Sequence, residues 1–221
     1  HKWVLEGLFG ECEQVTKTDD LIKEGYLSKF RIKVLLCKHA PQHFESYHDE
    51  MEYLVEHKGR NNLIKNLVND LEGNTLVLFN YVEKHGDPLY ELINSTIDPE
   101  RKLFFVHGGT DVEDREEVRQ ITETESNAII VASYGTFSTG INIKRLHNIV
   151  FASPSKSRIR NLQSIGRVLR KGEGKDIATL YDIADDIGGQ NYTLKHLNER
   201  VNIYNNENFK YEVIRVNLRA N

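Results

Sequence analysis

Short apolar runs of about five residues recur through the middle of the chain, separated by stretches with helical periodicity. Runs that are apolar at consecutive positions are typical of strands buried on both faces of a sheet. The expected strands are 75–79, 102–106, 128–132, 148–152 and 177–183, with a further apolar run at 32–36. The expected helices are 60–71, 87–95, about 110–123 and 159–170. Strands that alternate with helices predict an α/β fold, a mostly parallel sheet with helices on both sides.

The two ends of the chain follow a different pattern. Residues 41–57 are polar and rich in histidine, and residues 191–210 have the pattern of a helix rich in asparagine. Residues 211–218 alternate between apolar and polar positions, which is typical of a strand at the edge of a sheet. We therefore expect the α/β domain to carry extensions at its N- and C-terminal sides.

The composition is that of a folded domain. Of the 221 residues, 39% are hydrophobic and 28% are charged, enough for a packed core. No apolar run has the length of a transmembrane helix and no signal peptide is visible, so we expect a cytoplasmic protein with no membrane partner. Cys12 and Cys37 are the only cysteines, which excludes a disulfide-rich scaffold and a cysteine-based zinc finger. Because the sequence begins with His1 and its single methionine is Met51, we expect a fragment of a longer protein.

Charge is distributed unevenly along the chain. The net charge of −4 argues by itself against a nucleic-acid partner. Residues 144–175, however, hold nine basic residues and one acidic residue, a local charge of +8, so the remainder carries −12. A basic block of this kind is typical either of a solvated charged face or of a local anion site.

Ligands bind parallel α/β sheets at the carboxyl ends of the strands, so the loops after the predicted strands are the candidate sites. The predicted helix 159–170 follows one of them. Gln163, Arg167 and Arg170 share one face of this helix, and its apolar residues lie on the opposite face. Two permanent charges with planar donor forks, aimed in one direction, suit a polyphosphate.

A second candidate segment is the loop after the predicted strand 128–132. It carries hydroxyl side chains from Ser133 to Thr139, including Thr136, and two glycines, Gly135 and Gly140. Small hydroxyl residues and exposed backbone amides can hold phosphate oxygens, although such loops are also common as plain turns.

These segments resemble the motifs of superfamily-two helicases, in the order and at the spacing of that family. The sequence Gln163-Ser-Ile-Gly-Arg167-Val-Leu-Arg170 matches motif VI, Gln-x-x-Gly-Arg-x-x-Arg, and residues 133–143 resemble motif V. Residues 75–86 resemble motif IV, and residues 106–109 are similar to the strand-end motif that follows it. The resemblance covers about residues 60–190, and the residues in and around the motifs are most similar to those of the recombination helicases of tailed bacteriophages.

The resemblance implies the second of two RecA-like motor domains, with a three-layer α/β fold and ATP bound in the cleft between the two. It divides the chain into the tail of the first motor domain with a connector (1–40), the second RecA-like domain (41–190) and a C-terminal helix and strand extension (191–221). The implied cofactor is ATP with Mg²⁺. No Walker A or Walker B sequence occurs in this chain, so the preceding domain would hold the metal, and this chain alone is expected not to hydrolyse ATP.

The family motifs also imply a role for individual residues. Arg167 and Arg170 take the positions of arginine fingers, catalytic groups that stabilise the transferred phosphoryl group, with Gln163 in support. Gly140 and Asn142 join the two arginines as nucleotide-binding residues, and Asn142 stands where many members carry aspartate.

The implied nucleic-acid contacts lie in the other motifs. Ser133 takes the position of the motif V hydroxyl that contacts the nucleic-acid backbone. The further contacts to the bound strand are Thr136, His107, Gly108 and Asn80.

Three interpretations follow. The resemblance to phage helicases implies DNA, as branched recombination intermediates or stalled forks, and the preceding motor domain as partners. An RNA helicase has the same motifs, and a non-motor α/β module that binds a phosphate-bearing ligand is the alternative from another class. Asp182, Asp185 and Asp186 follow a predicted strand, where they could orient the motif VI arginines, form a metal site or belong to a plain loop.

Overall fold

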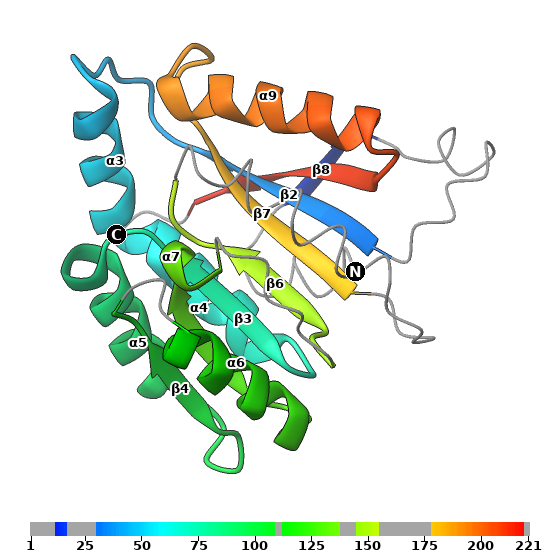
Figure 1. The fold of residues 1–221 in the computed structure, drawn as a ribbon. Coiled ribbons are helices and arrows are strands. Elements are labelled where there is room, and N and C mark those ends of the chain that lie inside the picture. Colours follow the sequence, from blue (N-terminus) through cyan, green and yellow to red (C-terminus); the bar gives the residue numbers. More distant parts are fainter. Residues whose placement is uncertain (1–11, 17–29, 109–111, 138–144, 155–177, 219–221) are drawn as a thin grey trace.

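The computed structural model of the chain describes residues 12–16, 30–108, 112–137, 145–154 and 178–218 (Figure 1). Its strands are β1 (Cys12–Thr16), β2 (Phe30–Lys38), β3 (Thr75–Phe79), β4 (Leu103–Val106), β5 (Ile129–Ser133), β6 (Asn148–Phe151), β7 (Ala178–Asp186) and β8 (Lys210–Asn217). Its helices are α3 (Tyr47–Glu56), α4 (Lys58–Asp70), α5 (Asp87–Asn94), α6 (Val112–Thr124), α7 (Tyr134–Phe137) and α9 (Tyr192–Asn206), with a π-helical turn η1 (Val82–Gly86).

The strands form one sheet in the order β1-β8-β2-β7-β6-β3-β5-β4. The seven strands from β8 to β4 are parallel to their neighbours, and β1 is antiparallel to β8. The α/β fold with a mostly parallel sheet is therefore confirmed, and each expected strand from 75–79 to 177–183 is present with ends shifted by three residues at most.

Helices cover both faces of the sheet, as Figure 1 shows. On one face α4 and α5 pack against β3, β5, β6 and β7, and on the other α6 and α9 pack against the same strands. The alternation along β3 shows why both faces must be covered. Val77 and Phe79 point to the face covered by α4 and α5, whereas Leu76 and Leu78 point to the face covered by α6 and α9. All four side chains are fully buried. Burial on both faces explains the consecutive apolar positions in the sequence.

Two asparagines fix the amino edge of the sheet. The Asn74 side chain donates to the carbonyls of Glu125 (2.7 Å) and Arg145 (3.0 Å) and accepts from the amide of Ala128 (3.0 Å). Asn148 donates to the carbonyl of Glu72 (2.8 Å). These bonds join loops far apart in the sequence and satisfy backbone groups that would otherwise be buried without partners.

The sheet extends beyond the domain boundaries expected at residues 40 and 190. β2 lies between β7 and β8, and β8 lies between β2 and β1, so both strands are inside the sheet. The prediction of an edge strand at 211–218 is therefore wrong, because β1 covers the outer side of β8. The stretch 41–57, which gave no apolar pattern, contains α3, whose N-terminus is capped by the Ser46 hydroxyl accepting from the amide of Asp49 (3.1 Å).

Helix α9 is attached to the domain through buried polar contacts. Glu50 of α3 is fully buried and accepts from the backbone amides of Tyr192 (2.9 Å) and Thr193 (2.7 Å), the first residues of α9. An anion at this position satisfies amides that a helix leaves unpaired and complements the positive end of the helix dipole. The C-terminal helix is thus part of the same folded unit as α3.

Within the described ranges, no helix combines the length and the apolar character needed to cross a membrane.

Candidate functional site

Residues predicted to contact nucleic acid meet at the carboxyl ends of three adjacent strands. Asn80 follows β3, Ser133 ends β5, and His107 and Gly108 follow β4, and the sheet places these strands side by side in the order β3-β5-β4. Neighbouring strands lie about 4.8 Å apart, so the three strand ends span on the order of 10 Å. The fold therefore brings residues from three separate motifs to one edge of the sheet.

The hydroxyl pair at the end of β5 has one open and one buried member. Ser133 is half-buried, Thr136 of α7 is fully buried, and their hydroxyl oxygens lie 3.0 Å apart. Because Thr136 has no exposed surface, it is placed to orient the hydroxyl of Ser133 rather than to meet a ligand itself.

An aromatic column supports His107. Its ring centroid lies 4.8 Å from that of Phe105, which lies 5.6 Å from Phe79 in a stacked arrangement and 5.1 Å from Tyr90. Phe79 is fully buried and His107 is exposed, so the column runs from the core to the rim. Gly108 has φ of +134°, a conformation that favours glycine.

Several elements hold the exit from β6. The hydroxyl of Ser153 accepts from the backbone amide of Asn80 (3.0 Å) and contacts Nδ1 of His85, while its carbonyl accepts from the Tyr134 hydroxyl (2.9 Å). Nε2 of His85 lies 2.9 Å from the side-chain oxygen of Asn61, so it carries the proton and Nδ1 accepts from Ser153. Ser153 and His85 are fully buried, which makes this a structural junction.

A buried ion pair lies beside this exit. Nε of Arg60 in α4 is 3.0 and 3.1 Å from the two carboxylate oxygens of Asp185 in β7, and Nη1 donates to the carbonyl of Ala152 (2.6 Å). Nε2 of His39 lies 2.8 Å from the same carboxylate. Burial alone would raise the pKa of Asp185, but the charge of Arg60 and the hydrogen bond from His39 outweigh it and hold that pKa well below its usual range.

The other two aspartates of this region are also paired inside the protein. Asp182 receives two bonds from Arg200 (2.7 and 3.0 Å) and one from the Tyr204 hydroxyl (2.5 Å), both in α9, and Asp186 pairs with Lys38 (2.7 Å). All three aspartates lie within β7 rather than in a loop, so the plain-loop interpretation is wrong. Their partners are residues of α4, α9 and β2, and over the described part of the chain no group of three or more His, Cys, Asp or Glu side chains could hold a metal ion.

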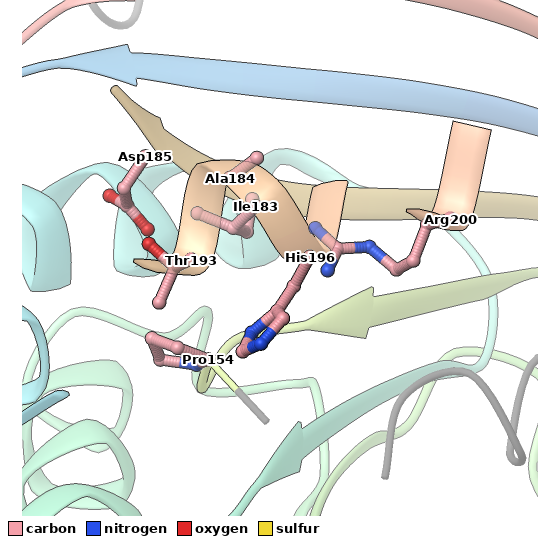
Figure 2. Close-up of a pocket in the computed structure, with 7 residues that line it drawn as sticks. All are labelled: Pro154, Ile183, Ala184, Asp185, Thr193, His196 and Arg200. Carbon is pink, nitrogen blue, oxygen red and sulfur yellow. The ribbon is translucent and has the colours of Figure 1, made fainter. Parts of the chain in front are cut away.

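Figure 2 shows a shallow pocket between the inner side of α9 and the end of β6. Its lining residues are Pro154, Ile183, Ala184, Asp185, Thr193, His196 and Arg200. Its two charged side chains are committed to the ion pairs with Arg60 and Asp182. The pocket is therefore a packing feature of the β7–α9 contact and does not offer an unpaired charge to a ligand.

The predicted arginine fingers and nucleotide-binding residues lie outside the described residues. These are Gln163, Arg167, Arg170, Gly140 and Asn142. The chain that leads to motif VI is described as far as Pro154, where the contacts of Ser153 and Ala152 hold it.

Sequence reasoning missed Arg60, Tyr134 and Ser153. Arg60 had a detectable signal, because it lies three and four residues before Leu63 and Ile64, on the apolar face of its helix. A charge on the buried side of an amphipathic helix requires a buried partner. Tyr134 and Ser153 gave no such signal, because their neighbours in space come from other motifs.

A parallel sheet between two helical layers, polar side chains aligned on its carboxyl edge and a Gln-x-x-Gly-Arg-x-x-Arg sequence after β6 define the second RecA-like domain of a superfamily-two helicase. The chain belongs to the family described as helicase conserved C-terminal domain, which matches residues 59–172.

Known proteins support this assignment. The chain is 35% identical to the ATP-dependent DNA helicase uvsW of Enterobacteria phage T4, over 96% of this chain and 46% of that protein. The crystal structure of T4 UvsW matches with a TM-score of 0.72, covering 87% of this chain and 42% of that one. The C-terminal domain of the DEAD-box protein Dbp5 matches with a TM-score of 0.53 at 13% identity, over 81% of this chain and 89% of that one, which shows a shared fold. The chain thus spans about half the length of its curated relative.

Proposed function

We propose that this chain is the C-terminal motor domain of an ATP-dependent DNA helicase or translocase. The observation that carries the proposal is the motif VI sequence, Gln163-x-x-Gly-Arg167-x-x-Arg170, in a chain that belongs to the helicase C-terminal family. The relative named as an ATP-dependent DNA helicase supports DNA as the nucleic acid. The resemblance of the sequence motifs to those of phage recombination helicases motivates branched recombination intermediates or stalled forks as the proposed substrates.

In this proposal Arg167 and Arg170 reach the γ-phosphate of ATP that is bound to the preceding domain, and Gln163 supports them. Gly140 and Asn142 complete the nucleotide contact from this side of the cleft. Bound ATP supplies the phosphoryl group whose transfer to water drives the motor. Arginine fingers stabilise the charge of that transition state and raise the rate by roughly 10³–10⁵-fold in characterised systems.

The Mg²⁺ that accompanies ATP would be held by the preceding domain. The described carboxylates nearest the exit from β6 are engaged by cations of this chain, Asp185 by Arg60 and Asp182 by Arg200. A carboxylate that neutralises a buried arginine is poorly placed to bind a metal ion as well. These pairs support a chain that supplies arginines and no metal ligands to the site. Because its sequence contains no Walker A or Walker B motif, the isolated chain is expected not to hydrolyse ATP.

The nucleic-acid strand would follow the carboxyl edge. Ser133, His107, Gly108 and the loop of Asn80 would contact its backbone, with Thr136 orienting Ser133. The basic block at residues 144–175 would add positive charge for the phosphate backbone, so that strand affinity should fall as salt rises.

The test uses the full-length protein with Arg170→Ala. ATP turnover should fall by at least about 10³-fold, the usual effect of losing an arginine finger, while nucleotide binding changes little. Turnover is measured with single-stranded DNA, forked DNA and matching RNA, and binding with a fluorescent ATP analogue. Wild-type turnover in the variant would remove Arg170 from the catalytic role. Stimulation by RNA but not DNA would replace the DNA proposal with an RNA helicase.

A further inference from the structure

The exit from β6 connects the proposed nucleic-acid loops to the start of the motif VI segment. Three consecutive buried residues, Ala152, Ser153 and Pro154, form this exit. The carbonyl of Ala152 is bound by Arg60 and the carbonyl of Ser153 by Tyr134. The chain then continues toward Gln163, nine residues after Pro154.

Two of the groups that hold Ser153 belong to the proposed nucleic-acid loops. The amide of Asn80 donates to the hydroxyl of Ser153, and Asn80 follows β3. Tyr134 directly follows Ser133, and its hydroxyl donates to the carbonyl of Ser153. The Tyr134 ring also packs edge-on against Phe151 of β6, with centroids 5.8 Å apart.

The position of Ser153 is also fixed by the strand order. β3 and β6 are hydrogen-bonded neighbours. The chain runs from β3 to β4 toward one end of the sheet, whereas it runs from β6 to β7 toward the other end. Strands that diverge in this way form the switch point of a parallel sheet, where ligand-binding loops separate. Ser153 bridges this divergence through its bond to Asn80, so a shift of either loop must move or break a hydrogen bond to the buried hydroxyl of Ser153.

We propose that Tyr134 and Ser153 are positioning residues that transmit nucleic-acid binding to ATP hydrolysis. This inference rests on the proposed function, because it assumes that the loops of Ser133 and Asn80 contact the strand. A strand seated on these loops fixes Tyr134 and the Asn80 amide, which in turn fix Ser153 and the chain entering motif VI. ATP turnover is then higher when nucleic acid is bound.

The test is Tyr134→Phe in the full-length protein, which removes one hydroxyl and keeps the ring against Phe151. The turnover number for ATP is measured with and without saturating single-stranded DNA. We expect the DNA-stimulated turnover number to fall about fivefold, the factor that one ordinary hydrogen bond corresponds to. The basal turnover number, the KM for ATP and the affinity for DNA should stay within twofold of wild type.

The matched control is Tyr204→Phe, which removes a buried hydroxyl that donates to the carboxylate of Asp182 and not to the carbonyl of Ser153. This control should lower thermal stability yet keep the ratio of stimulated to basal turnover. Ser153→Ala removes the acceptor of the Asn80 amide and should lower the ratio of stimulated to basal turnover, as Tyr134→Phe does. The double variant should lower this ratio by less than the product of the two single factors, because both substitutions remove a hydrogen bond of Ser153.

The outcomes separate the two levels of the proposal. If the wild-type protein shows no nucleic-acid-stimulated ATPase, the proposed function itself fails. If the wild type is stimulated and Tyr134→Phe is stimulated equally, only the transmission role fails. Equal loss of basal and stimulated turnover in Tyr134→Phe also overturns that role, because the hydroxyl would then act on folding alone.

Discussion

Replacing Arg60 by methionine tests how strongly the buried ion pair holds α4, β6 and β7 together. Methionine keeps an unbranched stem of similar length but removes the guanidinium. In the variant Asp185 keeps His39 as its remaining side-chain partner, and the carbonyl of Ala152 loses its donor. Arg60 is fully buried and Asp185 is 1% exposed, so water cannot replace the lost charge without a rearrangement.

Breaking a buried pair by removing one partner costs about 3–5 kcal/mol, because the other charge is left uncompensated. One feature of Arg60 reduces the free-energy loss expected for the variant. Nη2 of Arg60 is buried and has no hydrogen-bond partner in the part of the chain that the structure describes, so its removal breaks no hydrogen bond there. We therefore expect a loss of about 3 kcal/mol, which for a chain of this size lowers Tm by roughly 6–12 °C.

The assay is thermal and urea unfolding at several pH values, and the pH dependence has a defined sign. In the wild type the folded-state pKa of Asp185 is depressed, so its contribution is present above about pH 4 and is lost as the pH falls through the folded value. In Arg60→Met only His39 still opposes the effect of burial, so the folded-state pKa of Asp185 is higher than in the wild type and acid costs the folded variant less. The difference in Tm between the wild type and Arg60→Met should therefore be smaller at pH 4 than at pH 7.

A second substitution sharpens the test. Asp185→Asn should destabilise the wild type but stabilise Arg60→Met, because it removes the uncompensated charge. The control is Arg101→Met, which loses bonds to the carbonyls of Asn127 and Gly73 but strands no carboxylate. If Asp185→Asn destabilises both backgrounds equally, or if the Arg101 variant shows the same narrowing, the uncompensated-charge explanation is refuted.

Two further predictions concern the fold. Gly73→Ala should cost about 2 kcal/mol more than Gly189→Ala: both glycines have φ of +91°, but a Cβ on Gly73 would lie 2.6 Å from Cγ of His147 whereas one on Gly189 meets nothing within 4 Å. Urea unfolding of the two variants gives the difference, and equal losses would contradict a steric cause. Burial, then the charge of Glu212, raises the pKa of Tyr181 to about 12, so its stabilising contribution is complete below pH 10 and is lost between pH 10 and pH 12. Tyr181→Phe should therefore become more stable relative to wild type by up to about 2.7 kcal/mol over that range, and an unchanged difference between pH 9 and pH 12 would exclude this.

The layered α/β fold could be predicted because its strands are buried on both faces. In β3 and β5 the apolar residues are consecutive, and no other element gives that pattern so clearly. Helix α3 could not be predicted in the same way. It buries Met51, Leu54 and Val55, but its remaining positions are tyrosine, histidine and acidic residues, and its N-cap, Ser46, lies in a stretch crowded with histidine. β8 was placed at an edge because its alternation gives no information about β1, a strand nearly 200 residues earlier.

The candidate site also has a part that the sequence predicts and a part that depends on the strand order. Asn80, His107 and Ser133 could be selected from the sequence because each directly follows one of the strands predicted at 75–79, 102–106 and 128–132. The pairing of Arg60 with Asp185 could not be predicted, since 125 residues separate them and the sequence does not reveal which strands are neighbours. A hydrogen bond such as that from Tyr134 to Ser153 depends on the strand order, which only the fold provides.

The position of β2 has a consequence for how the domain is made. Lys38 at the end of β2 pairs with Asp186, 148 residues later in the chain, and the other side of β2 pairs with β8, which is later still. During synthesis at about 5–20 residues per second, β2 leaves the ribosome many seconds before either neighbour exists. Until then its apolar residues and open backbone edges must be shielded, either by transient local contacts or by a chaperone. Such high contact order predicts slow folding of this half of the sheet, with the β3–β5–β4 half able to form first.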